Sequence, residues 1–129
     1  MTHPNEQLIR NVLAAFQTGN LEAIARLYAQ DVVLHIPGRN RLSGEYRGLG
    51  DVLGGLARFR QITNESWSAE LHDVLANDKH GVALFTRRGA RGGRSAAFRT
   101  VMVYHLREGR IVEIWIHEGD QQAFDEFFS

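Results

Sequence analysis

The stretch from Gly19 to Gly48 constrains the fold of this chain more than any other. A short helical segment leads directly into an apolar run, residues 32–36, whose β-branched residues favour a strand. Pro37 and Gly38 break that strand, and a polar loop with further glycines and arginines follows. A helix that passes into a strand and an irregular loop can form both a wall and the entrance of a cavity. We therefore expect this stretch to make one side of a ligand cavity.

The residues before this stretch predict an amphipathic helix over residues 4–18, for which Gly19 is a natural end. Asn20 is expected to cap the next helix, because its side-chain oxygen can accept a free N–H of the first turn. That helix should end near Gln30, and Arg39 to Gly50 should form a loop. Asp51 is then expected to cap a third helix that runs to Ile62.

From Trp67 onward the pattern changes to strands separated by turn signals. The tail, residues 121–129, has phenylalanines at a helix-like spacing and is expected to dock by its aromatic rings. Helices followed by an antiparallel meander predict an α+β fold. We expect a cone-shaped single domain over residues 1–129, with three helices on a strongly curved, mostly antiparallel sheet that encloses a cavity. The four predicted strands are Trp67–Ala76, Gly81–Arg88, Ser95–Arg107 and Arg110–Glu118.

Composition narrows the class of protein. The chain has 129 residues, with 15 basic and 15 acidic side chains. Zero net charge argues against general binding to nucleic acid or to an anionic membrane. There is no cysteine, which excludes disulfides and thiolate metal sites. No apolar run approaches the ~20 residues that span a bilayer, and the first residues lack the pattern of a signal peptide, so we expect a cytoplasmic protein.

The chain resembles the nuclear transport factor 2-like superfamily, in its SnoaL-like and ketosteroid-isomerase-like branch. The resemblance spans nearly the whole sequence, and it is specific for the fold rather than for an activity. It implies a homodimer through the outer face of the sheet, where β-branched residues (Val101, Val103, Val112, Ile114 and Ile116) would otherwise be exposed. The segments that carry the resemblance are Gly19–Ile24, Leu27–Asp31, His35–Pro37, Gly44, Gly48 and Gly109–Glu113.

The sequence departs from the steroid isomerases of that branch at three positions. Their general-base aspartate would fall at Ile36, their oxyanion-hole tyrosine near Val12 and their second oxyanion donor near Met102. The isomerase mechanism combines a carboxylate base with two donors aimed at an enolate, a case that the field has worked out in detail. All three positions are apolar here, so we do not expect that mechanism. SnoaL-like cyclases instead use a histidine and an aspartate, which this chain can supply.

The strongest candidate cluster is Glu113, Trp115, His117 and Asp120, on and just after the last predicted strand. Alternation places the first three on one face of that strand. His117 with Asp120 nearby would form a general acid–base pair in which the carboxylate orients the imidazole. The competing interpretation is that both residues belong to a dimer surface or cap a turn.

The orientation of this cluster depends on the turn at Glu108–Gly109. If the turn has two residues, Leu106 lies opposite Ile111, and Trp115 and His117 share a face with the pocket residues of the preceding strand. A turn longer by one residue reverses the last strand. The residues that would line the pocket in the first case are Phe98, Thr100, Met102 and Tyr104; those facing inward in the second are Val112, Ile114 and Ile116.

His35 at the end of the first strand is a third candidate catalytic residue, although a hydrogen-bonded histidine at a sheet edge is the simpler interpretation. His72 beside Asp73 is a weak signal. The histidines have no metal-ligand spacing, so no metal and no cofactor is expected. The arginine–glycine run 87–94 resembles a nucleic-acid segment, but a solvated hairpin loop is the preferred interpretation.

Aromatic and apolar residues at the predicted inner positions are candidate ligand contacts. We hypothesise a cofactor-independent acid–base enzyme (isomerase, cyclase or hydrolase type) acting on an apolar small molecule. A non-catalytic binding or dimerisation module of the same fold is the alternative. Epoxide hydrolysis by an Asp–Arg–Asp arrangement is a weaker hypothesis, because alternation places Arg99 on the other face of its strand from Thr100 and Met102. The candidate ligand contacts are Tyr28, Tyr46, Phe59, Trp67, Phe85, Phe98, Met102, Tyr104 and Trp115.

Overall fold

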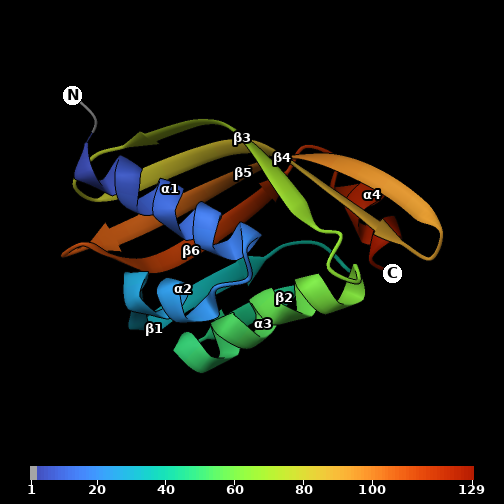
Figure 1. Ribbon diagram of the computed structural model, residues 1–129, viewed down its shortest axis with the longest axis horizontal. Coiled ribbons are helices and arrows are strands. Elements are labelled where there is room, and N and C mark those ends of the chain that lie inside the picture. Colours follow the sequence, from blue (N-terminus) through green and yellow to red (C-terminus); the bar gives the residue numbers. More distant parts are fainter. Residues whose placement is uncertain (1–2) are drawn as a thin grey trace.

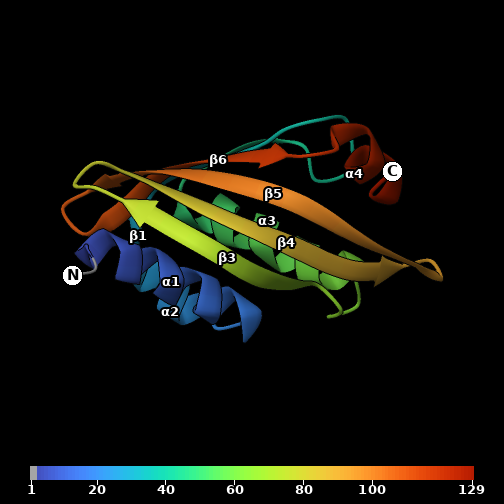
Figure 2. The same cartoon turned by 90° about the horizontal axis from the view of Figure 1, so that it is seen from above.

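The computed structural model describes residues 3–129, which form four helices and a six-stranded mixed sheet. The strand order is β2-β1-β6-β5-β4-β3; β1 and β6 are parallel, and all other neighbours are antiparallel. Figures 1 and 2 show the helices and the sheet from two sides. The elements are α1 (Pro4–Gln17), α2 (Leu21–Leu27), β1 (Tyr28–Ile36), β2 (Gly44–Arg47), α3 (Leu49–Ile62), β3 (Ser68–Ala76), β4 (His80–Arg91), β5 (Arg94–Arg107), β6 (Arg110–Glu118) and α4 (Gln121–Phe127).

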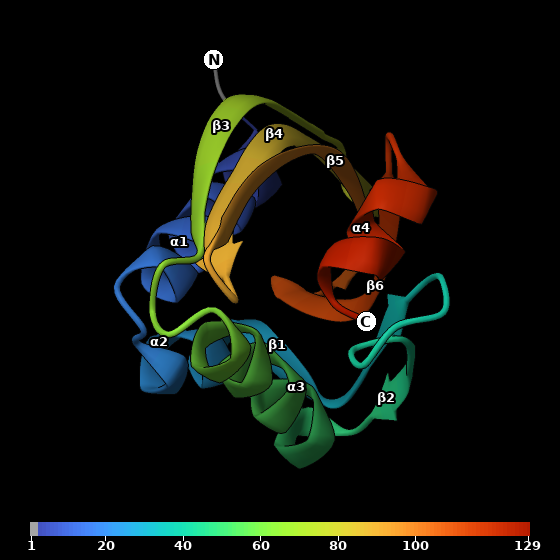
Figure 3. The ribbon, with the colours of Figure 1, turned by 90° about the vertical axis from the view of Figure 1, so that its right-hand side faces the viewer.

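The sheet is strongly curved. Seen along its strands, it bends into an arc, and α1, α2 and α3 close the side that the arc leaves open (Figure 3). The α+β class and the curved, mostly antiparallel sheet agree with the sequence prediction. No helix within residues 3–129 is long and apolar enough to cross a lipid bilayer.

The first two helices begin and end near the predicted positions. Gly19 adopts a positive φ of 71° after α1, a conformation that glycine reaches without steric cost. The Asn20 side chain then accepts the backbone N–H of Ala23 at 3.1 Å, which confirms it as the cap of α2. The prediction that this helix reaches Gln30 is wrong. The strand starts at Tyr28, because that residue already pairs with Ile111 of β6.

Two predictions about residues 39–62 are wrong. The expected loop contains a short strand, β2, which pairs with β1 at the edge of the sheet. The third helix begins at Leu49, and its N-cap is Gly48, with a φ of 87°, instead of Asp51. Asp51 lies in the first turn, where its negative charge complements the positive end of the helix dipole.

The expected count of three helices is also wrong, because the tail forms α4. Its Phe124, Phe127 and Phe128 are at most 4% exposed and pack against Phe59, Trp67 and Phe98. The tail therefore docks by its aromatic rings, and these rings occupy much of the space that the curved sheet surrounds. A wide enclosed cavity of the kind the sequence predicted is not confirmed.

Candidate functional site

A β-bulge in β6 decides which side chains face the helices. The turn at Glu108–Gly109 has two residues, as predicted, and Leu106 lies opposite Ile111. The next pair is His105 with Glu113, so Val112 is an extra residue on β6. One extra residue turns every later side chain of β6 to the opposite face of the sheet.

The predicted inward face of β6 is therefore wrong. Ile114, Ile116 and Glu118 face the helices, opposite Tyr104, Met102 and Thr100 of β5. Glu113, Trp115 and His117 lie on the outer, convex face, where they are half-buried or exposed.

A small apolar pocket lies between α1, α3 and the inner face of the sheet. About 40 Å³ of it is accessible to the centre of a water molecule, within about 570 Å³ of space that includes the open mouth. Arg87 is the only charged residue that lines it within the described chain. The other lining residues are Val12, Leu13, Phe16, Tyr28, Leu34, Leu56, Phe59, Ala69, Phe85, Met102, Tyr104, Ile114 and Ile116.

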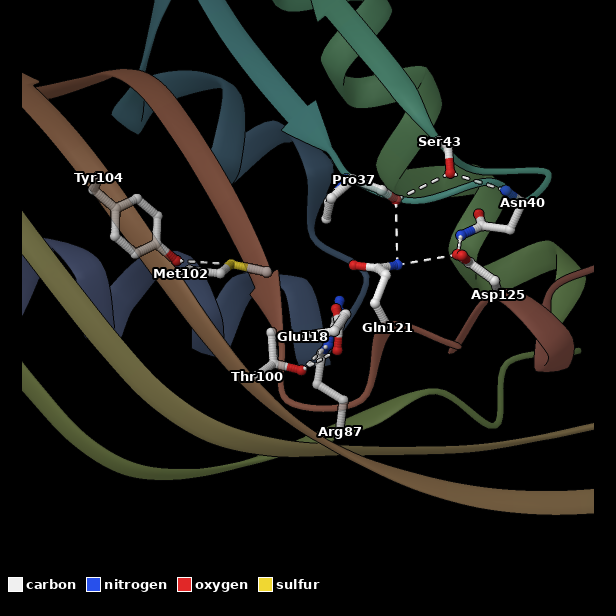
Figure 4. A network of polar contacts seen from close by, with 10 residues as sticks. All are labelled: Pro37, Asn40, Ser43, Arg87, Thr100, Met102, Tyr104, Glu118, Gln121 and Asp125. Carbon is white, nitrogen blue, oxygen red and sulfur yellow. Dashed lines mark hydrogen bonds and ion pairs between the residues drawn. The ribbon is translucent and has the colours of Figure 1, made fainter. Parts of the chain in front are cut away.

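Arg87 reaches this pocket because β4 alternates, which places it on the same face as Ala83 and Phe85. Its Nε donates to Thr100 Oγ1 at 3.1 Å, and one Nη donates to Glu118. Thr100 Oγ1 in turn donates to the other carboxylate oxygen of Glu118 at 2.9 Å (Figure 4). The side chains of Arg87 and Glu118 are only 3% and 1% exposed. The second Nη of Arg87 makes no hydrogen bond with any of residues 3–129.

Aromatic rings surround the guanidinium. Its Cζ lies 5.0 Å from the centre of the Trp67 ring and 5.3 Å from that of Phe124, with Phe59 and Phe85 slightly farther away. Burial lowers the pKa of Arg87 below its ordinary value, and the charge of Glu118 opposes that shift. An arginine paired with a carboxylate and enclosed by aromatic faces stays charged in a setting of low dielectric.

Two tyrosines complete the polar groups of the pocket. Tyr28 and Tyr104 are 4% and 1% exposed, and burial raises the pKa of each phenol well above its ordinary value of 10. Both therefore remain neutral O–H donors. Tyr104 donates to Met102 Sδ at 3.2 Å, which is a weak acceptor.

The fold does not bring the three candidate catalytic residues together in the pocket. Asp120 caps α4, where its carboxylate accepts the N–H of Ala123 at 3.0 Å. His117 is exposed on the convex face. His35 also faces outward, with its Nε2 2.5 Å from Glu113 Oε2 and its ring stacked on Trp115 at 5.7 Å.

The nine candidate ligand contacts divide into three groups. Tyr28, Phe59, Phe85, Met102 and Tyr104 line the pocket, while Trp67 and Phe98 belong to the aromatic cluster beside it. The other two lie elsewhere. Tyr46 packs against Gly55 of α3 and donates its hydroxyl to Leu42 O at 2.6 Å. Trp115 is on the convex face.

Of the five apolar residues predicted for the convex face, Val101 and Val103 lie there, but the other three do not. Val112, Ile114 and Ile116 are at most 8% exposed in the interior. The convex face instead carries other half-buried apolar side chains, and Arg99 is exposed there. A homodimer through this face stays a prediction. The apolar residues of this face include Val82, Leu84, Val101, Val103 and Trp115, together with Leu75, which is exposed.

Sequence reasoning missed Arg87, Thr100 and Glu118 as a unit. The run 87–94 is not the solvated loop that the sequence predicts, because β4 continues to Arg91 and the turn is only Gly92–Gly93. The signal was present, because Arg87 has the same strand parity as Phe85, which was already a predicted wall residue. Within residues 3–129, no three histidine, cysteine, aspartate or glutamate side chains are placed to hold a metal ion.

The family model of the SnoaL-like domain matches residues 9–114. In sequence, the chain is 28% identical over 123 residues to the uncharacterized protein Rv0034 of Mycobacterium tuberculosis, covering 95% of this chain and 94% of that protein.

Solved structures of the same fold are similar over almost their full length. Bal32a, from a soil-derived mobile gene cassette, has a TM-score of 0.94 at 26% identity, covering 98% of this chain and 97% of that one. An NTF2-like protein of unknown function from Burkholderia pseudomallei has a TM-score of 0.88 at 23% identity, with 99% of each chain covered. IdmH, a proposed polyketide cyclase from Streptomyces antibioticus, has a TM-score of 0.77 at 22% identity, covering 95% and 97%. The fold is therefore NTF2-like.

Proposed function

The chain belongs to the SnoaL-like family, and from its pocket we propose that it binds an apolar carbonyl compound and promotes its enolisation, or the ring closure that follows from it, without a cofactor. The α-proton passes to solvent water, and Arg87 stabilises the enolate oxygen. The observation that supports this most directly is Arg87, a charged donor that lines an otherwise apolar pocket and has one Nη without a protein partner. IdmH, a structural neighbour, is a proposed polyketide cyclase, and ring closure of such compounds develops negative charge on a carbonyl oxygen.

The electrostatics of the Arg87 pair favour a neutral carbonyl over an anion. Glu118 already balances the charge of Arg87, so the pair as a whole carries no net charge toward the pocket. The Nη–H groups that make no hydrogen bond within residues 3–129 remain available as donors to a bound oxygen. Such a donor stabilises the oxygen most when negative charge develops on it, because the interaction grows with that charge and is weakly screened in an apolar pocket.

Two matched ligands test whether the pocket selects a carbonyl: 2-tetralone, a bicyclic ketone, and tetralin, the same rings without the oxygen. A hydrogen bond to a charged donor predicts about ten-fold tighter binding of 2-tetralone to the natural chain. The variant Arg87→Met/Glu118→Met removes both charges together and should lose that preference. Dissociation constants from tryptophan fluorescence or calorimetry measure it, and equal binding of the two ligands to the natural chain would exclude the proposed function.

Turnover is tested by hydrogen–deuterium exchange at the carbons next to the carbonyl of 2-tetralone, followed by NMR in D₂O. Enolisation by the protein predicts exchange faster than in buffer, and the Arg87→Met/Glu118→Met variant should abolish the acceleration. Folding of the variant is verified by circular dichroism, so a lost rate can be assigned to the lost donor.

A non-catalytic binding module is the second candidate. One observation favours it: no carboxylate or imidazole lines the pocket within residues 3–129. This candidate predicts the same preference for 2-tetralone over tetralin but no accelerated exchange. Binding and exchange measured on the same sample therefore separate the two functions.

A further inference from the structure

The second polar feature of the pocket is the pair of hydroxyls on Tyr28 and Tyr104. These residues are 76 positions apart in the sequence, but β1 and β5 both neighbour β6, and both side chains line the pocket. At 4% and 1% exposed, they are almost completely removed from bulk water. Neither residue takes part in the Arg87 pair.

These hydroxyls lack good partners in the protein. The Tyr28 hydroxyl makes no hydrogen bond with any of residues 3–129, and that of Tyr104 is paired only with the thioether of Met102. The Tyr28 oxygen keeps some contact with solvent, since Trp67 Nε1 is the only fully buried side-chain N or O atom without a partner within residues 3–129. A hydroxyl that loses this water when a ligand enters, and finds no strong acceptor, costs about 1–3 kcal/mol relative to a paired one. Such a cost is offset when a bound molecule brings an acceptor of its own.

The tyrosines and Arg87 face the pocket from different ends. Thr100, which holds Arg87, and Tyr104 lie four residues apart on the same face of β5, or about 13 Å along a strand. Figure 4 shows the Tyr104 hydroxyl directed back toward Met102, which lies between them. The distance between the two sets of donors is therefore shorter than that spacing. It matches the span of about two fused rings, and such a ligand would have to widen the pocket beyond its present volume of about 40 Å³.

We propose that Tyr28 and Tyr104 form a second polar subsite that binds an oxygen at the far end of the ligand. The substrate class is then a flat, mostly apolar molecule with oxygen at two ends, a carbonyl toward Arg87 and a hydroxyl or second carbonyl toward the tyrosines. This inference rests on the proposed function for the assignment of the carbonyl end, while the tyrosine end is tested on its own.

The experiment compares 2-tetralone with 6-hydroxy-2-tetralone, which adds a phenolic oxygen on the ring remote from the ketone. The natural chain should bind the hydroxylated ligand about five- to ten-fold more tightly. The variant Tyr28→Phe/Tyr104→Phe keeps both rings and removes both hydroxyls, so it should bind the two ketones equally while still preferring 2-tetralone over tetralin.

Each outcome has one meaning. Equal binding of the two ketones by the natural chain overturns the subsite and indicates that the hydroxyls are served by water. A preference that persists in the double phenylalanine variant overturns it as well, because the extra oxygen then binds elsewhere. Loss of the preference for 2-tetralone over tetralin in the natural chain would instead refute the proposed function. The melting temperatures of Tyr28→Phe, Tyr104→Phe and the double variant verify that all three are folded.

Discussion

Strand β6 carries two glutamates that each pair with a basic side chain, on opposite faces of the sheet. Glu118 faces inward and pairs with Arg87, and the two side chains are 1% and 3% exposed. Glu113 faces outward and pairs with His35, and both side chains are 31% exposed. The same residue type on one strand therefore has two settings, and only the inner one combines a permanent charge with a pocket. The comparison shows that the face, rather than the residue, determines what a charged pair can do here.

The largest expected effect comes from truncating each glutamate alone. Glu118→Ala leaves Arg87 buried without its counter-charge, which should lower the free energy of unfolding by about 3–5 kcal/mol. Glu113→Ala removes a half-exposed partner of His35 and should cost about 1 kcal/mol or less. Urea denaturation of the two variants measures the difference.

The matched control for the inner pair is Arg87→Met/Glu118→Met, which replaces both charges with side chains of similar volume. Exchanging a whole buried pair for apolar residues is often close to neutral. We therefore expect the double variant to be more stable than Glu118→Ala. Equal costs for Glu118→Ala and Glu113→Ala would show that the two faces do not differ in the way described.

The same contrast explains which parts of the structure could be predicted from the sequence. The helix spacing and the Glu108–Gly109 turn are local signals, and both gave correct elements. The face of β6 was not predictable, because Ile111 and Val112 are adjacent apolar residues of opposite parity and both are buried. Alternation cannot show which of them is the extra residue of the bulge, and every assignment from Glu113 to Glu118 depends on that choice.

Strand β2 was missed for a different reason. Its residues, Gly44–Arg47, alternate neither in polarity nor in burial, and the strand exists through backbone pairing with β1. Tyr28 is a third case, since pairing with β6 takes it out of the preceding helix. Pairing between distant segments overrides local preference at such positions. The predicted placement of Trp115 and His117 in the pocket depended on the bulge, whereas most of the aromatic wall did not depend on it.

The two tryptophans offer a smaller test of the comparison between the faces. Trp67 is buried inside, and its Nε1–H has no partner within residues 3–129. Trp67→Phe removes this unpaired donor but also some packing volume, two effects that each amount to about 1–3 kcal/mol and act in opposite directions. We expect a net change within about 1 kcal/mol of the natural chain by urea denaturation.

Trp115→Phe is the outer counterpart of that variant. It keeps an aromatic ring against His35 on the half-exposed face, so its change in stability should also be small. The reason differs: Trp115 is only partly buried, whereas two opposing effects cancel at Trp67. A loss above about 2 kcal/mol for Trp67→Phe would show that Nε1 has an acceptor, such as an ordered water. Trp67→Leu also removes the N–H donor but leaves a smaller side chain, so it should be clearly less stable than Trp67→Phe.

The smallest expected effect concerns Asp125 on α4, a carboxylate that belongs to neither face of the sheet. Burial alone would raise the pKa of Asp125. Three hydrogen bonds lower it by more: one from Asn40 Nδ2 at 2.7 Å, one from Gln121 Nε2 at 3.0 Å and one from the backbone of Arg39. The pKa of Asp125 is therefore held below its ordinary value of 3.8. These bonds connect α4 to the loop after β1 (Figure 4).

A carboxylate whose pKa is lower in the folded chain stabilises the fold above the ordinary pKa, and this stabilisation is lost as the pH falls through the folded value. The natural chain should therefore be more stable than Asp125→Asn near pH 6, and the difference in melting temperature should shrink as the pH falls below 4. Because Asp125 is only half-buried, solvent screening keeps the difference below about 1 kcal/mol. Glu126→Gln, an exposed neighbour on the same helix, is the control and should show no comparable trend. A difference between the natural chain and Asp125→Asn that stays constant from pH 6 to 3 would mean that the ionised form of Asp125 contributes nothing. The contacts of Asp125 with Asn40 and Gln121 would then stabilise α4 through the shape of the side chain alone. Of the pairs compared, only Arg87–Glu118 would stabilise the fold through its charges.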